Sequence, residues 1–292
     1  MSIALIILAA GKGTRMESDL PKVLHRIAHA PMLWHAMRAG QALEPARVVV
    51  VAGHEAEMVI ASAQDYDPEA RVVLQGEQLG TAHAVAQAAP ELADFDGDAI
   101  VLYGDTPFIS QDTLEAMARA RAIHDVVVLG FEAADPGRYG RLVTEGDALL
   151  RIVEFKDATD EERAITLCNS GVVAADARTL FSLIEAVGND NAAGEYYLPD
   201  IVAIARERGL SAGVVHCAET ETLGVNSRAE LAGAEASFQR AARARMMEDG
   251  VTFHAPETVY LAWDTVIGRD AEVEPNVIFG SGVTIESGAR IR

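Results

Sequence analysis

Short, almost wholly apolar runs alternate with amphipathic segments through the first half of the chain. Strands of a parallel sheet are buried on both faces and therefore show such a continuous apolar pattern. Hydrophobic residues between the runs recur at helical spacing. The alternation predicts an α/β fold with a mostly parallel sheet and helices on both faces. The predicted strands cover residues 2–8, 47–52, 71–75, 99–103 and 125–131.

The spacing of apolar residues also predicts where helices and further strands lie. Pro31 suits the first position of a helix, and Asp112 is the expected N-cap of another. A hairpin is expected over 141–153, turning at residues 145–147, with a further strand over 168–175. The other predicted helices cover residues 81–89, 112–122, 176–187, 198–208 and 227–248.

The last part of the chain has a different period. Two sets of small or apolar residues recur every six positions, whereas a strand has a period of two and a helix one of 3.6. A period of six is typical of a hexapeptide β-helix. Chance spacing in a tail is the alternative, and it is disfavoured because both sets stay in phase. The sets are Ile267, Val273, Phe279, Ile285 and Ile291, and Thr265, Ala271, Val277, Val283 and Ala289.

These patterns divide the chain into three expected parts. Residues 1–226 form a Rossmann-like α/β domain, and residues 227–249 form a connector helix. Residues 250–292 form the beginning of a left-handed β-helix. A few hexapeptides bury little surface by themselves, so this last part resembles the start of a longer solenoid.

Composition limits the classes of partner. Half the residues are hydrophobic, which predicts a packed core, and the formal net charge is −20. So acidic a chain is not expected to bind nucleic acid or an anionic membrane. The two cysteines have no metal-like spacing, and we expect them to be reduced and buried in a cytoplasmic protein. The apolar run 3–10 is too short to span a bilayer.

A glycine-bearing loop follows the first predicted strand, where open α/β sheets place their ligands. Gly11 and Gly13 allow backbone N–H groups to approach a phosphate, and Arg15 and Lys22 add positive charge nearby. Neither a P-loop nor a dinucleotide fingerprint is present, since Met16 stands where the latter needs its third glycine. A simple turn is the alternative for this loop.

Asp105 follows the apolar strand over residues 99–103. A carboxylate at this end of a strand points into the ligand crevice and suits Mg²⁺, which prefers oxygen ligands. The alternative is an Asx-type turn before Pro107.

Several motifs, in order, resemble a known family. They are LAAGKGTRM with a following PK, QGEQLGTAHA, YGDTP, YGR, EFKDAT, NSG, GEYYLPD and GVNSR. Together with the period-six tail they resemble the bacterial bifunctional N-acetylglucosamine-1-phosphate uridyltransferases/glucosamine-1-phosphate acetyltransferases, over essentially the whole chain. The resemblance implies a Mg²⁺-dependent transfer of UMP from UTP to N-acetylglucosamine 1-phosphate, supplying UDP-N-acetylglucosamine for peptidoglycan and lipopolysaccharide.

The resemblance also implies a role for individual residues. Arg15, Lys22 and Asp105 are the expected catalytic residues, with Arg15 facing pyrophosphate and Lys22 bridging phosphates. Asp105 and Asn226 are the expected ligands of Mg²⁺. The remaining expected contacts are Leu8, Ala9, Ala10 and Gly11 under the nucleotide; Gln75, Gly80 and Thr81 at uracil and ribose; Tyr103, Gly104 and Asp105 over the nucleotide-sugar; and Gly140, Glu154 and Asn169 at the N-acetylglucosamine.

The chain ends after about five hexapeptides, whereas the family's acetyl transfer and trimer formation depend on a long β-helix. We therefore expect no acetyltransferase activity from this chain, and its trimerisation stays open. Three alternatives to uridyl transfer are another sugar-1-phosphate nucleotidyltransferase using glucose 1-phosphate or dTTP, a silent nucleotide-sugar binding module, and an acyltransferase.

Overall fold

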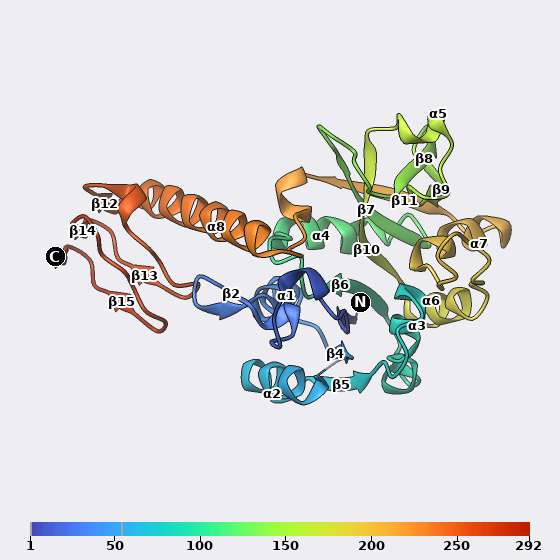
Figure 1. The fold of residues 1–292 in the computed structure, drawn as a ribbon, viewed down its shortest axis with the longest axis horizontal. Helices are drawn as coiled ribbons and strands as arrows, with labels where there is room; N and C mark the ends of the chain where they lie inside the picture. Colours follow the sequence, from blue (N-terminus) through green and yellow to red (C-terminus); the bar gives the residue numbers. More distant parts are fainter. Residues whose placement is uncertain (1, 54) are drawn as a thin grey trace.

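The computed structural model describes residues 2–53 and 55–292 of the chain. Its largest element is a nine-stranded sheet with the central order β11-β7-β10-β6-β1-β4-β5, to which the β8–β9 hairpin is attached through β10 (Figure 1). The strands are β1 (Ile3–Ala9), β4 (Arg47–Ala52), β5 (Arg71–Leu74), β6 (Asp98–Tyr103), β7 (Val126–Glu132), β8 (Arg141–Glu145), β9 (Ala148–Val153), β10 (Leu167–Asp176) and β11 (Ala212–Cys217).

The expected mostly parallel sheet is confirmed. Strands β6, β1, β4 and β5 pair in parallel, as do β7 and β11. Strand β10 is the exception, because it runs antiparallel to both β6 and β7. Between the paired strands β7 and β10 the chain forms the β8–β9 hairpin and the four-residue α5 (Asp160–Arg163) but no long crossover helix, which is compatible with antiparallel pairing.

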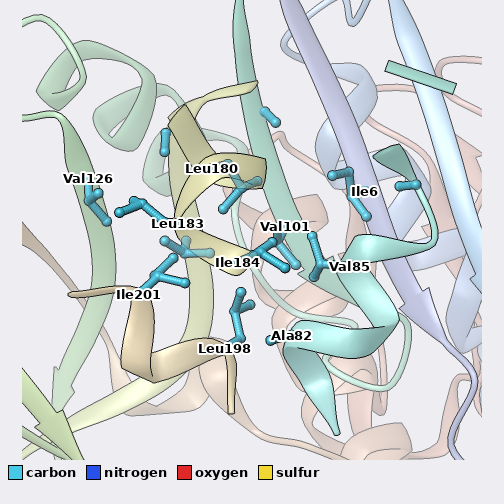
Figure 2. Packing of buried hydrophobic residues seen from close by; sticks show 14 of the residues in the cluster. Ile6, Ala82, Val85, Val101, Val126, Leu180, Leu183, Ile184, Leu198 and Ile201 are labelled. Atoms are coloured by element: carbon cyan, nitrogen blue, oxygen red, sulfur yellow. The ribbon is translucent and has the colours of Figure 1, made fainter. Parts of the chain in front are cut away.

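Helices cover both faces of the sheet, and successive strand residues point to opposite faces. Ile6 on β1 belongs to a buried cluster that includes residues of α3, α6 and α7, and Figure 2 shows Val85, Leu180 and Ile201 among its members. Its neighbours Leu5 and Ile7 pack on the other face with residues of α1, α2 and α4. The helices are α1 (Met32–Gln41), α2 (Ala56–Tyr66), α3 (Thr81–Ala86), α4 (Gln111–Ala120), α6 (Ala177–Ile184), α7 (Ile201–Glu207) and α8 (Arg228–Glu248).

Two expected helix starts are wrong by one or two residues. Helix α4 is capped by Ser110, whose Oγ accepts from the backbone N–H of Thr113 at 3.2 Å, so Asp112 lies in the first turn instead. Pro31 lies in β3 (Ala30–Pro31), which pairs with β2 (Arg26–Ile27), and it precedes α1. Ser and Asp are both good caps, and the sequence alone does not rank them.

Short parallel strands follow the long helix α8 and lie beside its far end in Figure 1. Paired positions such as Val266 and Thr284, or Glu272 and Arg290, are 18 residues apart, which is three hexapeptides per coil. Ile267, Val273 and Phe279 are buried inside these coils. The strands are β12 (Thr252–Phe253), β13 (Val266–Ile267), β14 (Glu272–Val273), β15 (Thr284–Ile285) and β16 (Arg290–Ile291).

Trp263 connects the coiled segment, which contains β12 to β16, with the sheet domain, which contains the nine-stranded sheet. Its ring lies 5.7 Å from that of Trp34 on α1, and its backbone N–H donates to the carbonyl of Ala28 at 2.9 Å. Arg38 donates to the Trp263 carbonyl at 2.8 Å. In the part of the chain that the structure describes, no helix is both long and apolar enough to cross a membrane.

Candidate active site

A cavity of about 300 Å³ opens beyond the carboxyl ends of β1, β5 and β6. A second cavity of about 310 Å³ adjoins it, because Thr81, Tyr103 and Glu195 line both. The first is lined mainly by residues that the sequence pointed to, and these are Leu8, Ala10, Gly11, Lys22, Gln75, Gly80, Thr81, Tyr103 and Asp105.

Lys22, Asp105 and Asn226 converge at the first cavity. The Lys22 ammonium forms an ion pair with Asp105 and donates a hydrogen bond of 2.8 Å to Oδ1 of Asn226. The side chains of Lys22 and Asp105 are only 11% and 18% exposed, so this charge pair is largely shielded from water. A carboxylate oxygen and an amide oxygen therefore both contact the Lys22 ammonium.

The segment that carries Asn226 is fixed to Asp105 and to α8. The Val225 N–H donates to the Asp105 carbonyl at 3.0 Å, and the Asn226 N–H donates to Glu230 Oε2 at 2.6 Å. Ser227 caps α8 by accepting from the Glu230 N–H. The start of α8 is thus part of the site, although it lies far from Asp105 in sequence.

Arg228, which the sequence analysis did not single out, connects three segments of the site. Its Nε donates to the Met16 carbonyl at 3.1 Å, and its Nη1 lies 3.2 Å from Nδ1 of the buried His25. Met16 follows Arg15, and His25 lies three residues after Lys22. An arginine can donate to several partners at once, but no pattern in the sequence around Arg228 predicts that it does so.

The loop after β1 reaches the site through Gly13. This residue has φ of 58°, and a Cβ on it would lie 2.6 Å from Cβ of Lys22. Arg15 lies on the short 3₁₀ helix Thr14–Met16 that follows. Its side chain is exposed and does not line the cavity, and within residues 2–53 and 55–292 it forms no hydrogen bond with Lys22, Asp105 or Asn226. Asn226, by contrast, joins the other two through its hydrogen bond to Lys22.

Gln75, Gly80 and Thr81 lie together at the other end of the first cavity. Gln75 donates from Nε2 to the Gly80 carbonyl at 3.1 Å. Gly80 has φ of 116°, and a Cβ there would lie 2.5 Å from the Tyr196 carbonyl oxygen. Gln78, which was missed, also lines the cavity and donates to the Ala10 carbonyl at 2.7 Å. The amide-rich motif QGEQ contained this signal.

Tyr103 forms the wall between the two cavities. Burial, followed by the nearby carboxylates of Asp105 and Glu154, raises the pKa of its phenol well above the usual range. Gly171 has φ of 91° and leaves room for this ring, since a Cβ there would lie 2.7 Å from Cε2 of Tyr103.

Gly140, Glu154 and Asn169 line the second cavity together. A Cβ on Gly140 would lie 3.1 Å from Glu154 Oε1, so the glycine gives the carboxylate space. Asn169 Oδ1 accepts from the Gly171 N–H at 2.9 Å. Arg138 also lines this cavity, and so do residues of the motifs YGR, NSG and GEYYLPD, which are Tyr139, Ser170, Gly171, Glu195, Tyr197 and Pro199.

Two further expected contacts lie outside the cavity linings. Ala9 packs in the core on the opposite face of the sheet from Leu8, because alternate residues of β1 point to opposite sides. Gly104 donates from its N–H to the Leu8 carbonyl at 2.9 Å, which holds the turn that presents Asp105.

Burial raises the pKa of Glu154, and the carboxylates of Asp200 and Asp157 raise it further. Arg141 opposes this effect, but its guanidinium is itself buried and donates to backbone carbonyls of Pro136, Gly137, Tyr139 and Arg163. The second cavity therefore holds a carboxyl group that is costly to ionise.

Residues 5–195 match the family described as MobA-like NTP transferase domain. The chain belongs to this family. The matched range begins in β1 and includes Lys22, Gln75, Asp105, Glu154 and Asn169, so both cavities lie mainly within the NTP transferase domain. Asn226 lies outside the matched range.

Two similar proteins match this chain over most of its length. The Bifunctional protein GlmU of Cereibacter sphaeroides is 70% identical over 100% of this chain, and that of Ruegeria pomeroyi is 69% identical over 92%. The matched region covers 64% of the length of the first relative and 60% of the length of the second.

The fold is also found in solved structures. A UDP-glucose pyrophosphorylase in complex with UDP-glucose superposes with a TM-score of 0.65 at 17% identity, covering 82% of this chain and 100% of that one. An inositol-1-phosphate CTP transferase from T. maritima gives a TM-score of 0.63 at 18% identity, covering 78% of this chain and 90% of that one. At such identities these matches show the fold of the NTP transferase domain alone.

Proposed function

We propose that this NTP transferase domain transfers UMP from UTP to N-acetylglucosamine 1-phosphate, giving UDP-N-acetylglucosamine and pyrophosphate. The observation that carries the proposal is the placement of Lys22 between Asp105 and Asn226 at the first of two adjoining cavities. One cavity provides amide groups for a base, and the other provides a carboxyl and an amide for a sugar.

Asp105 and Asn226 have the chemistry to hold Mg²⁺. A carboxylate and an amide oxygen are hard ligands, and both already contact one cation, the Lys22 ammonium. Asn226 is neutral, so a metal held by this pair retains positive charge. When bound, Mg²⁺ would neutralise charge on the phosphate oxygens.

The reaction needs little covalent chemistry from the protein. An oxygen of the sugar phosphate forms a bond to the α-phosphorus of UTP, while the bond from that phosphorus to the bridging oxygen of pyrophosphate breaks. Pyrophosphate leaves with the electron pair. The attacking phosphate has a second pKa of about 6 and is mostly dianionic at pH 7, so no general base is required.

Lys22 has the clearest catalytic role in this proposal. Its ammonium lies in the first cavity, largely shielded from water beside the two proposed metal ligands, so it can stabilise charge that develops on a phosphate there. We assign Arg15 to the departing pyrophosphate, because its exposed side chain lies on the loop that Gly13 brings against Lys22. Positioning and charge neutralisation then account for catalysis.

The second cavity supports an N-acetylated sugar. Glu154 can accept from sugar hydroxyls, and Nδ2 of Asn169 can donate to the acetamide carbonyl, because Asn169 Oδ1 is already bonded to the Gly171 N–H. Glucose 1-phosphate lacks the acetamide group that this donor would bind.

A pyrophosphate-release assay tests the proposal. With Mg²⁺ and UTP, we expect release with N-acetylglucosamine 1-phosphate, much slower release with glucose 1-phosphate, and none without sugar phosphate. Faster release with glucose 1-phosphate, or with dTTP in place of UTP, would assign the site to another sugar-1-phosphate nucleotidyltransferase. Binding of UDP-N-acetylglucosamine without any turnover would indicate a silent binding module.

A further inference from the structure

The side-chain amide of Gln75 has both of its N–H groups engaged inside the protein. Gln75 is only 6% exposed and lines the first cavity. Its Nε2 lies 3.1 Å from the Gly80 carbonyl and 3.1 Å from Nδ1 of His83. A carbonyl oxygen can only accept, so the nitrogen of the amide, and not its oxygen, must face Gly80.

The oxygen of the same amide is left for a ligand. Within residues 2–53 and 55–292, none of the hydrogen bonds involves Gln75 Oε1. This oxygen is also not among the fully buried polar atoms without a partner, so it is accessible from the cavity. An amide whose nitrogen is saturated by two acceptors can therefore offer only an acceptor to the cavity.

His83 is well placed to maintain this orientation. It lies on α3, whose first turn is held by hydrogen bonds from the Ala82 N–H to the Tyr196 carbonyl and from the Ala84 N–H to the Gly80 carbonyl. Since its Nδ1 accepts from Gln75, the neutral ring carries its proton on Nε2. The amide nitrogen of Gln87 lies 3.2 Å from that second nitrogen, but it can only donate, so its hydrogen bond goes to the His83 backbone carbonyl at 2.9 Å and the ring contact is one of packing.

We propose that His83 is a positioning residue that determines base specificity, by holding the Gln75 amide with Oε1 toward the base. This inference rests on the proposed function. Uracil has an N–H at position 3, which can donate to Oε1, whereas cytosine has a lone pair there and would be repelled. An amide free to turn over would offer an N–H to cytosine at little cost.

Gly80 alone is a weaker constraint than Gly80 and His83 together. Without the His83 acceptor, one amide hydrogen of Gln75 would be unpaired in a buried place, which makes a rotated or displaced amide more accessible. A site built around a specific hydrogen bond rejects a mismatched ligand because a buried polar group is then left unpaired. The discrimination between UTP and CTP should therefore depend on a residue that never contacts the base.

The test compares kcat/KM with UTP and with CTP for the wild type, His83→Ala and His83→Asn. Asn can place Oδ1 near the position of Nδ1 and accept from Gln75, so it is the matched rescue. We expect His83→Ala to reduce the UTP-to-CTP ratio by roughly 10-fold or more, and His83→Asn to restore most of it. KM for the sugar phosphate should stay within about twofold in both variants, since the second cavity is unchanged.

A purely structural role for His83 predicts a different result. Both nucleotides would then lose activity equally, and an unchanged UTP-to-CTP ratio in His83→Ala would overturn the inference. His254→Ala, which alters an exposed histidine on the coiled segment, serves as the control and should keep the wild-type ratio.

Binding measurements separate failure of this inference from failure of the proposed reaction. If the wild type releases no pyrophosphate from UTP, the proposed function fails, and titration with UDP and CDP still tests the base preference. Preference for UDP that weakens in His83→Ala supports the inference in that case, and equal affinities in the wild type contradict it.

Discussion

The ammonium of Lys22 donates a hydrogen bond of 2.8 Å to Oδ1 of Asn226, a residue 204 positions further along the chain. Lys22 lies just before the β2–β3 hairpin, and Asn226 lies just before α8. The same ammonium pairs with Asp105 beyond the end of β6. The position of the Lys22 ammonium therefore depends on a residue more than 200 positions away in the sequence. A substitution at the start of α8 should change how Lys22 contacts the phosphates.

Replacing Lys22 by alanine tests its proposed role directly. The variant removes a preorganised cation, and we expect kcat/KM for UTP to fall by about 10²–10³-fold, corresponding to about 3–4 kcal/mol of transition-state stabilisation. Steady-state pyrophosphate release measures this. Arg178→Ala, which removes an exposed cation that pairs with Asp96 at 3.6 Å, is the matched control. Turnover of Lys22→Ala near the wild-type value would rule out the assignment.

The proposed Mg²⁺ ligands make a separate prediction. Excess chelator should abolish pyrophosphate release, and added Mg²⁺ should restore it. Asn226→Ala should raise the Mg²⁺ concentration needed for half-maximal activity by roughly 10-fold or more, because an oxygen ligand is lost. Asp105→Ala should have a larger effect and lose about 3–4 kcal/mol of transition-state stabilisation.

The outcome for Asn226→Ala is informative because Asn226 also binds Lys22. If the amide acted only by orienting Lys22, kcat would fall with no change in the Mg²⁺ requirement. Activity that saturates at the wild-type Mg²⁺ concentration would therefore contradict the metal-ligand role.

The sequence predicted the sheet well because its strands are buried on both faces. The runs that become β1, β4 and β6 are continuously apolar, and their expected ranges differ from the observed ones by at most one residue at either end. Asp105 was found because the carboxyl end of a parallel strand is where ligands bind. The antiparallel direction of β10 was not predicted, since an apolar run carries no information about direction.

The site contacts that sequence patterns missed are between distant segments. Arg228 binds the Met16 carbonyl through its side chain, and Gln78 binds the Ala10 carbonyl. Backbone carbonyls are present at every position, so nothing in the sequence tells which one an arginine or glutamine will reach. Asn226 was assigned only through family resemblance, because a single asparagine in a loop has no period or spacing of its own.

Gly80→Ala should damage the base end of the first cavity. An alanine at φ of 116° is strained, and its Cβ would lie 2.5 Å from the Tyr196 carbonyl oxygen. We expect the free energy of unfolding to fall by about 1–3 kcal/mol. KM for UTP should rise more than KM for the sugar phosphate. Gly146→Ala is a useful control because Gly146 has φ of 59° with nothing within 4 Å of its Cβ position, so it should lose stability without a change in KM for UTP.

Glu154→Gln should stabilise the fold while impairing the reaction. Burial, followed by repulsion from Asp200 and Asp157, raises the folded-state pKa of Glu154 above its unfolded value of about 4.3. The folded state therefore binds more protons than the unfolded state between these two pKa values, so the Glu154 carboxyl lowers stability as the pH rises through that window. Below the unfolded pKa the carboxyl is protonated in both states, and this cost disappears.

Glutamine is neutral at every pH, so the stability difference between Glu154→Gln and the wild type should be small near pH 4 and favour the variant near pH 8. Denaturant unfolding at several pH values measures this difference. Glu145→Gln alters an exposed carboxyl on the β8–β9 turn and should show no such trend. KM for N-acetylglucosamine 1-phosphate should rise in Glu154→Gln, because an amide cannot replace the carboxylate as a double acceptor for sugar hydroxyls. A variant that is less stable than the wild type at pH 8 would show that the charged carboxylate stabilises the fold, contrary to the raised pKa.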